Sequence, residues 1–278
     1  MNVDLHCHSA VSDGELSPVE VVRRARTNGV ELLALTDHDQ LAGVEAAAHE
    51  AARLGVRFVP GVEISVTYAG DATIHIVGLG VDPLNPALLA GLAQSRGGRG
   101  ERAQRMAAEF ERLGIHGTLE GARRFARNPE MIGRAHFARH FVASGLMPNV
   151  RTVFEHYLSR GRPGFIQQKW ADLEDAVGWI RGAGGIAVIA HPARYHYLSA
   201  AALDRLFDEF IAFGGEAVEV VAGAHSPDEM FRFATVARRC GLLASRGSDF
   251  HAVNESPVDL GHCNPLPPDL TPVWSRLL

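Results

Sequence analysis

Short apolar runs alternate along the chain with longer segments in which apolar and polar residues recur at helical spacing. The runs are rich in Val, Ile and Leu, and such continuous apolar character is typical of strands buried on both faces of a parallel sheet. We predict seven strands, at Val3–Cys7, Leu32–Thr36, Arg57–Val62, Thr73–Leu79, Ile186–Ala190, Ala217–Val221 and Leu242–Arg246. Their alternation with helices predicts an α/β fold, a TIM-like (β/α)7 barrel distorted from the common eightfold form.

The segments between these strands carry recognisable helix ends. Ser17-Pro18-Val19-Glu20 is a capping box with proline at the first helical position, and Asn28-Gly29 closes that helix. Further helices are expected at residues 41–54, 172–181 and 226–240.

The alternation stops after Gly80. Four predicted helices then follow one another without a strand, at residues 99–113, 118–127, 133–144 and 150–159. We therefore predict that residues 1–96 and 160–278 form the barrel, and that residues 97–159 form a helical insertion that caps the active site.

Basic residues are concentrated in the same region. Residues 97–170 contain 13 Lys and Arg against 6 Asp and Glu, a local charge of +7 that leaves −12 for the rest of a chain whose total is −5. A basic block in an acidic protein is a candidate contact for an anionic substrate, although a solvated helical surface gives the same pattern. Lys169 is the only lysine, and a chain rich in Arg can keep Lys where a compact ammonium donor is needed.

Composition limits the class of protein. No apolar run reaches the roughly 20 residues of a membrane span, and the first residues lack the basic and apolar regions of a secretory signal. Cys7, Cys240 and Cys263 are an odd, sparse set that suits reduced thiols in a cytoplasm better than a disulfide framework. We therefore expect a cytoplasmic protein without membrane contact or an obligate protein partner.

Histidine and carboxylate residues recur at the ends of the predicted strands. His6 and His8 lie two apart on one strand, so both side chains face the same side while Cys7 faces the other. In a parallel barrel the strand ends meet at one rim, where active sites form. Helix caps and turns explain one such residue but not the whole set, which is His6, His8, Asp13, His38, Glu63, His75, His191, Asp249 and His251.

The chemistry of this set predicts bound metal ions. Imidazole and carboxylate ligands without thiolate suit Mn²⁺, Fe²⁺ or Zn²⁺. Nine candidates are too many for one ion, and at about three protein ligands per catalytic ion they predict two or three. We expect Mn²⁺, with Glu63 as a bridging carboxylate.

The chain resembles the polymerase and histidinol phosphatase (PHP) superfamily in motifs that span its whole length. They are His6-Cys7-His8-Ser9 with Asp13-Gly14, Thr36-Asp37-His38-Asp39, Pro60-Gly61-Val62-Glu63, Ala190-His191-Pro192 and Gly247-Ser248-Asp249-Phe250-His251. The resemblance implies a distorted (β/α)7 barrel with three metal ions. The implied ligands are His6, His8, Glu63 and Asp249 for the first ion, Glu63, His75 and His191 for the second, and Asp13, His38 and His251 for the third.

A narrower resemblance lies near the insertion. Ile132-Gly133-Arg134-Ala135-His136 and Tyr157-Leu158-Ser159-Arg160-Gly161 are similar to a bacterial branch of nucleoside 3′,5′-bisphosphate phosphatases and 5′-to-3′ exoribonucleases that act on short RNA. The usual Gly-Arg-Pro-His has Ala135 in place of proline here. The resemblance implies removal of the 3′-phosphate from a nucleoside 3′,5′-bisphosphate. The alternatives are a histidinol-phosphate or other small phosphomonoester phosphatase, and a regulatory module, which would be expected to have lost ligands.

Three residues are candidates for substrate contacts. Arg134 lies at a predicted helix start, where a phosphate also meets backbone N–H groups, although a surface arginine is the simpler reading. His196 follows His191 on a rim loop, where the alternatives are a proton donor to a leaving group, a phosphate contact and an ordinary loop histidine. We therefore name Arg134 and His196 as catalytic candidates, and Arg134, Lys169 and His196 as substrate-binding candidates.

Overall fold

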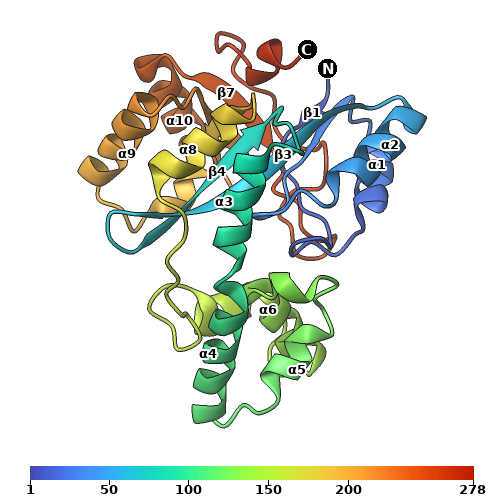
Figure 1. Cartoon of the computed structure of the whole chain (residues 1–278), viewed down its shortest axis with the longest axis vertical. Helices are drawn as coiled ribbons and strands as arrows, with labels where there is room; N and C mark the ends of the chain where they lie inside the picture. The colour runs from blue at the N-terminus through green and yellow to red at the C-terminus, as the bar shows by residue number, and fades with distance from the viewer.

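The computed structural model describes residues 1–278. One sheet contains all seven predicted strands in sequence order, namely β1 (Val3–Asp4), β2 (Leu32–Leu35), β3 (Arg57–Tyr68), β4 (Ala72–Leu79), β5 (Ile186–Ile189), β6 (Ala217–Ala222) and β7 (Leu243–Gly247). The N–H of Leu5 donates to the carbonyl of Arg246 at 3.1 Å and links the first strand to the last. The sheet is therefore nearly closed (Figure 1), and the predicted α/β barrel is confirmed.

The direction of β4 differs from the prediction of a parallel sheet. β4 pairs antiparallel with both β3 and β5, whereas the other pairs are parallel. Only three residues, 69–71, separate β3 from β4, which is too short for the crossover that parallel neighbours need. The start of β4, rather than its end, therefore lies at the rim where the parallel strands end.

The first strand is shorter than predicted. Regular pairing in β1 ends at Asp4, and Cys7 forms only an isolated bridge with Phe250. The chain between them still lies in the sheet, because Thr36 N–H donates to the Cys7 carbonyl at 3.0 Å and His8 N–H donates to the Phe250 carbonyl at 2.9 Å. The side chain of Cys7 packs with the outer helices, as the alternation predicts.

The two faces of the sheet bury separate apolar clusters. In β2, Leu32 and Ala34 join a cluster formed largely by the strands, whereas Leu33 and Leu35 pack with residues of α1 (Pro18–Thr27) and α2 (Val44–Leu54). This alternation places the first cluster inside the barrel. The outer face of the later strands is covered by α3 (Pro86–Arg96), α8 (Leu173–Gly182), α9 (Ala200–Ala212) and α10 (Pro227–Cys240). None of the helices combines the length and apolar character that a membrane span requires.

A group of helices lies between α3 and α8, at one end of the molecule and away from both termini (Figure 1). It buries its own apolar cluster, centred on Phe110, Phe137 and Phe141. The elements are α4 (Arg99–Arg112), α5 (Thr118–Arg123), a 3₁₀ turn (Pro129–Met131), α6 (Arg134–Ala143), α7 (Val150–Val153) and a π-helical turn (Phe154–Leu158).

Replacing Gly247 by Ala should destabilise the barrel. A Cβ at this position would lie 2.3 Å from the Cβ of His6 and 2.7 Å from its backbone nitrogen. Overpacking of this kind costs about 1–3 kcal/mol, and we expect the free energy of unfolding in urea to fall by about that amount. The control is Gly178→Ala in α8, where an added Cβ meets no atom within 4 Å. That change should raise the free energy of unfolding by up to about 1 kcal/mol, and a similar gain for Gly247→Ala would contradict the close approach.

Candidate metal centre

The nine predicted ligands converge at one end of the barrel. They come from the segments that follow β1, β2, β5 and β7, from the middle of β3 and from the start of β4. Their donor atoms form groups that lie within 4.8 Å of one another, namely His6–His8–Asp249, His6–Glu63–His191, His38–Glu63–His75 and His8–Asp13–His38–His251. The fold therefore brings together residues from near the start of the chain, such as His6, and residues as distant as His251.

The side chains of His6, His8, Glu63 and Asp249 lie close together. The Nε2 atoms of His6 and His8 lie 3.2 Å apart, and each lies 3.3–3.4 Å from a carboxylate oxygen of Glu63. Asp249 Oδ1 lies 3.6 Å from His6 Nε2 and 3.3 Å from His8 Nε2. Two adjacent ligands at about 2.1 Å from one octahedral ion are about 3 Å apart. The spacing fits the four ligands that the resemblance assigns to the first ion.

Glu63 joins this group to its neighbours. Its side chain is 1% exposed, and its Oε1 lies 2.9 Å from both His75 Nδ1 and His191 Nε2. Its Oε2 lies 2.8 Å from His38 Nδ1. Burial alone would raise the pKa of Glu63, but the imidazoles of His38 and His75 hold it well below its usual value. An ionised carboxylate with imidazoles around both oxygens suits a bridging ligand.

Asp13 and His251 complete the cluster on the side facing solvent. Asp13 Oδ1 lies 3.4 Å from His251 Nε2, and its Oδ2 lies 3.9 Å from His38 Nε2. Each nitrogen of His38 therefore faces a different carboxylate, Glu63 or Asp13. The division of the nine ligands among three ions stays a prediction, because His8 and His38 each belong to two of the groups.

Several buried atoms of the cluster lack hydrogen-bond partners. His38 Nδ1 and Glu63 Oε2 lie 2.8 Å apart but outside hydrogen-bond geometry, as two ligands of one ion would. His8 Nδ1 and His191 Nδ1 are also buried without a partner. A polar atom buried in this way costs about 1–3 kcal/mol unless something satisfies it. These atoms are imidazole nitrogens and carboxylate oxygens, which are common ligands of divalent metal ions, so bound ions would satisfy them.

Burial and neighbouring charges act against each other to set the protonation states of the cluster. Burial and the charge of His251 lower the pKa of His8 to about 3, so its imidazole is neutral at neutral pH. Burial alone would raise the pKa of Asp249, but Arg194 and His6 hold it well below its usual value. Burial lowers the pKa of His251, but Asp13 and Asp249 together raise it to about 9.

The backbone is strained at this rim. Of the four non-glycine residues with positive φ, Asp39 (47°), His191 (27°) and Asp249 (53°) lie here. Such conformations persist where surrounding contacts hold them, and they concentrate at functional sites. Asp39 is held by the N–H of Ser65, which donates to its Oδ1 at 2.9 Å, and by an ion pair with Arg99.

Two charged residues at the centre were missed from the sequence. Glu219 in β6 contacts His6 and the backbone of His191, and Arg194 forms an ion pair with Asp249. The signal for Glu219 was present, because it is the only charged residue in the otherwise apolar strand 217–222. Arg194 lies in a loop without periodicity, where one arginine is not informative.

A cleft of about 900 Å³ opens above the metal ligands. Arg134 and His196 line it, whereas Lys169 is exposed and lies outside its lining. Arg99 and Arg102 also line the cleft. The cleft therefore joins the metal centre to the basic helices.

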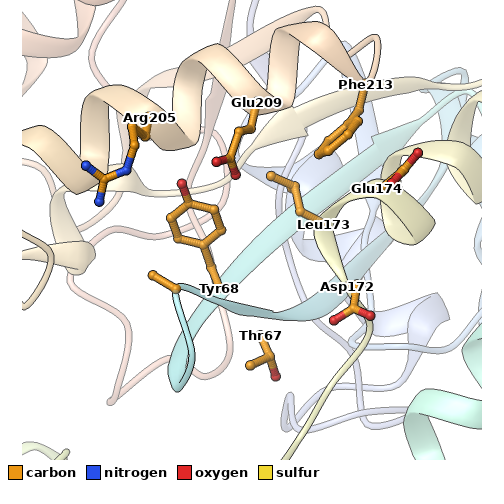
Figure 2. A pocket seen from close by; sticks show the side chains of 9 residues that line it. Thr67, Tyr68, Asp172, Leu173, Glu174, Arg205, Glu209 and Phe213 are labelled. Carbon is orange, nitrogen blue, oxygen red and sulfur yellow. The ribbon is translucent and has the colours of Figure 1, made fainter.

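A second pocket of about 530 Å³ lies on the outside of the barrel, between the β3–β4 hairpin, the start of α8 and α9 (Figure 2). It contains none of the nine ligands. Three carboxylates line it, those of Asp172, Glu174 and Glu209, against the single cation Arg205. This charge would repel a phosphate, so the cleft above the metal ligands is the candidate active site.

A β/α barrel that gathers nine imidazole and carboxylate ligands under a basic cleft is the architecture of a metal-dependent hydrolase. The chain belongs to the PHP domain family, whose sequence profile matches residues 4–127. The 3′,5′-nucleoside bisphosphate phosphatase of Chromobacterium violaceum is 54% identical over 276 residues, which cover 99% of this chain and 96% of that protein. The resemblance seen in the motifs is confirmed.

Two further comparisons extend this relationship. The 5′-3′ exoribonuclease Rnm of Escherichia coli is 42% identical over 274 residues, which cover 98% of this chain and 92% of that protein. The crystal structure of a candidate metal-dependent phosphoesterase from Bifidobacterium adolescentis matches with a TM-score of 0.83 and 30% identity, covering 99% of this chain and 94% of the other. The names of these three proteins thus have phosphate ester hydrolysis in common.

We expect the purified chain to bind more than one divalent ion, and a chelator to lower its melting temperature because the ions bind the folded state. His191→Ala should reduce the bound metal and the protection that metal gives against heating. His49→Ala, on the exposed face of α2, is the matched control and should change neither. The measurements are elemental analysis and thermal melts with and without chelator. One ion or none, with melting indifferent to the chelator, would contradict the metal centre.

Proposed function

We propose that this chain removes the 3′-phosphate from nucleoside 3′,5′-bisphosphates. The observation that carries the proposal is the single cleft that joins six of the nine metal ligands to a group of three arginines, Arg99, Arg102 and Arg134. Only Arg99 in this group has a carboxylate partner. A ligand with two separated phosphates matches both ends of such a cleft. The relative from C. violaceum, which carries this activity in its name, supports the same assignment.

The reacting phosphate would lie over the metal ligands. Divalent ions held there would supply the Lewis acidity that activates the attacking water and neutralises charge on the phosphoryl group. The chain's own residues exclude bulk water below this point, because His6, His8 and Glu63 are almost fully buried. Arg194, which lines the same cleft and pairs with Asp249, offers a further cation to the phosphoryl oxygens.

Arg99, Arg102 and Arg134 form the arginine cluster that would bind the second phosphate. Arg102 is 7% exposed, and its Nε donates to the Ile166 carbonyl at 2.9 Å, with no carboxylate within ion-pair distance. Burial and the neighbouring charges of Arg134 and Arg99 lower the pKa of Arg102. Only Arg99 has an acidic partner, Asp39. Buried cations usually require an anion, and a phosphate would satisfy these.

Arg134 occupies the first position of α6, where the first N–H groups have no partner within the helix. Its guanidinium stacks between Phe154 and Phe165, each with its ring centre 5.7 Å away, and it has no carboxylate partner. A phosphate at this point would meet the guanidinium and the helix N-terminus together. Arg134 therefore remains the leading candidate for holding the 5′-phosphate.

His196 lines the cleft, is exposed and stacks edge-on against Tyr197 with ring centres 5.6 Å apart. This position suits the predicted role of a proton donor to the leaving oxygen or a phosphate contact. Lys169, outside the cleft lining, is not included in the proposal.

Short 5′-phosphorylated RNA is a second candidate substrate. The relative from E. coli supports it by name, and Arg151 and Arg160 extend the basic lining of the cleft beyond the arginine cluster. A strand whose 5′-phosphate reached Arg134 would place its first phosphodiester over the metal ligands. Histidinol phosphate, with one phosphate, would leave the arginine cluster without an anion.

We propose Mn²⁺ as the resident ion, because a mixed set of imidazoles and carboxylates suits it. After chelation, Mn²⁺ should restore more activity than Zn²⁺ or Fe²⁺ when each is supplied under matched conditions. Fuller recovery with either of the others would reassign the metal and leave the substrate proposal intact.

Arg134→Ala and Arg102→Ala should lower kcat/KM for adenosine 3′,5′-bisphosphate by one to three orders of magnitude, because binding of the remote phosphate orients the reacting one. Turnover of a generic aryl phosphate should change much less. Arg105→Ala, on the exposed side of the same helix as Arg102, is the control and should behave like wild type.

The substrate panel adds adenosine 3′-phosphate, adenosine 5′-phosphate, histidinol phosphate and a short 5′-phosphorylated RNA. Wild-type enzyme acting on adenosine 3′-phosphate should reproduce the defect of Arg134→Ala on the bisphosphate. Best turnover of histidinol phosphate, or an equal effect of Arg134→Ala on every substrate, would refute the assignment.

A further inference from the structure

Glu219 is a buried carboxylate beneath the metal ligands. It lies in β6, where Val218 and Val220 face the outer helices and Ala217 faces the barrel interior, so Glu219 also points inward. A β-bulge interrupts the pairing of β6 with β7 between Glu219 and Val221. Bulges commonly re-aim a side chain next to an active site.

Both oxygens of Glu219 contact residues of the metal centre. Oε1 lies 2.7 Å from His6 Nδ1, and Oε2 accepts a hydrogen bond from the backbone N–H of His191. Glu219 is 1% exposed, and no arginine or lysine forms an ion pair with it. These two histidines come from opposite parts of the barrel, after β1 and after β5.

The contact with His6 determines which ring nitrogen carries the proton. A carboxylate only accepts hydrogen bonds, so the proton lies on Nδ1 and the lone pair lies on Nε2. Nε2 is the atom that lies 3.2 Å from His8 Nε2 and 3.6 Å from Asp249 Oδ1. Glu219 thus directs the free lone pair of His6 toward His8 and Asp249.

The contact with His191 holds a strained backbone. His191 has φ 27° and ψ 58°, a conformation that residues with a side chain rarely adopt. The hydrogen bond from its N–H to Glu219 helps fix this turn, which places His191 Nε2 2.9 Å from Glu63 Oε1. One side chain therefore orients a ligand assigned to the first ion and a ligand assigned to the second.

We propose that Glu219 is a positioning residue that sets the affinity of the centre for its metal ions by orienting His6 and His191 together. The inference rests on the proposed metal centre and goes beyond it, since Glu219 itself contacts neither the reacting phosphate nor an ion. Outer carboxylates that orient a metal-binding histidine typically change metal affinity 10–100-fold when they are removed.

Glu219→Gln is the informative variant, because it keeps the shape of the side chain but offers only one acceptor for two N–H donors. We expect the apparent Kd for Mn²⁺, measured by competition with a chelator, to rise 10–100-fold, with activity recovering as Mn²⁺ is raised. Melting of the chelated protein should stay near that of wild type. Glu219→Ala should weaken binding further; if it does not fold, Glu219→Gln still gives the result.

Glu50→Gln is the control for loss of a buried carboxylate. Glu50 is 5% exposed and pairs with Arg23 and Arg53 on the outer helices, so its loss should lower stability without changing metal affinity. In chelated wild type, long-range proton–nitrogen NMR should show His6 protonated on Nδ1. Equal Mn²⁺ affinity in wild type and Glu219→Gln would overturn the role of Glu219 alone, whereas wild type without bound metal would overturn the metal centre itself.

Discussion

The burial of Glu63 is the constraint on which the rest of the site depends. A carboxylate that is 1% exposed inside a barrel loses several kcal/mol of hydration unless opposite charges and hydrogen-bonding groups replace the water. Imidazoles supply them from nearly every direction, with His75 and His191 at one oxygen and His38 at the other. His38 follows β2, His75 lies in β4 and His191 follows β5, so these strands and β3 must reach the same height for the charge to be tolerated.

The antiparallel hairpin explains how two of these residues reach that height. β3 continues past the end of β2, its one parallel neighbour, and Glu63 therefore lies in mid-strand rather than at a strand end. β4 returns along it, with His75 opposite Ser65 in the pairing register. A crossover helix at this point would have delivered the end of a strand to the rim. The hairpin instead places the start of β4 at the rim, so that the paired strands β3 and β4 carry Glu63 and His75 side by side.

Much of this arrangement was predictable from local pattern, and the exceptions have physical causes. The period-two alternation of His6 and His8 and the apolar runs ending in polar ligands predicted the barrel and the convergence of the nine residues. The direction of β4 was missed because a buried strand has the same apolar composition in either orientation. Glu219 was missed because its role depends on partners that are distant in the sequence. His6 is more than 200 residues away, and His191 is 28 residues away. Lys169 was chosen because it is the only lysine, and the rarity of a residue type does not predict whether it lies near the active-site cleft.

Opposite charges at the two ends of one cleft determine which ligands the site can tell apart, namely those with one phosphate and those with two. The carboxylates at the rim need cations, and Arg102 and Arg134 need anions. Bound metal ions would supply the cations, and a phosphate of the substrate would supply the anion. A ligand with one phosphate satisfies only one end and leaves the guanidinium groups of Arg102 and Arg134 without an anion. Because specificity is a difference between such free energies, the unpaired arginines disfavour the wrong ligand as much as they favour the right one. In its proposed role Glu219 acts beneath the metal end of this cleft, since a histidine turned away from the metal ligands would misplace the reacting phosphate relative to the arginine proposed to bind the other phosphate.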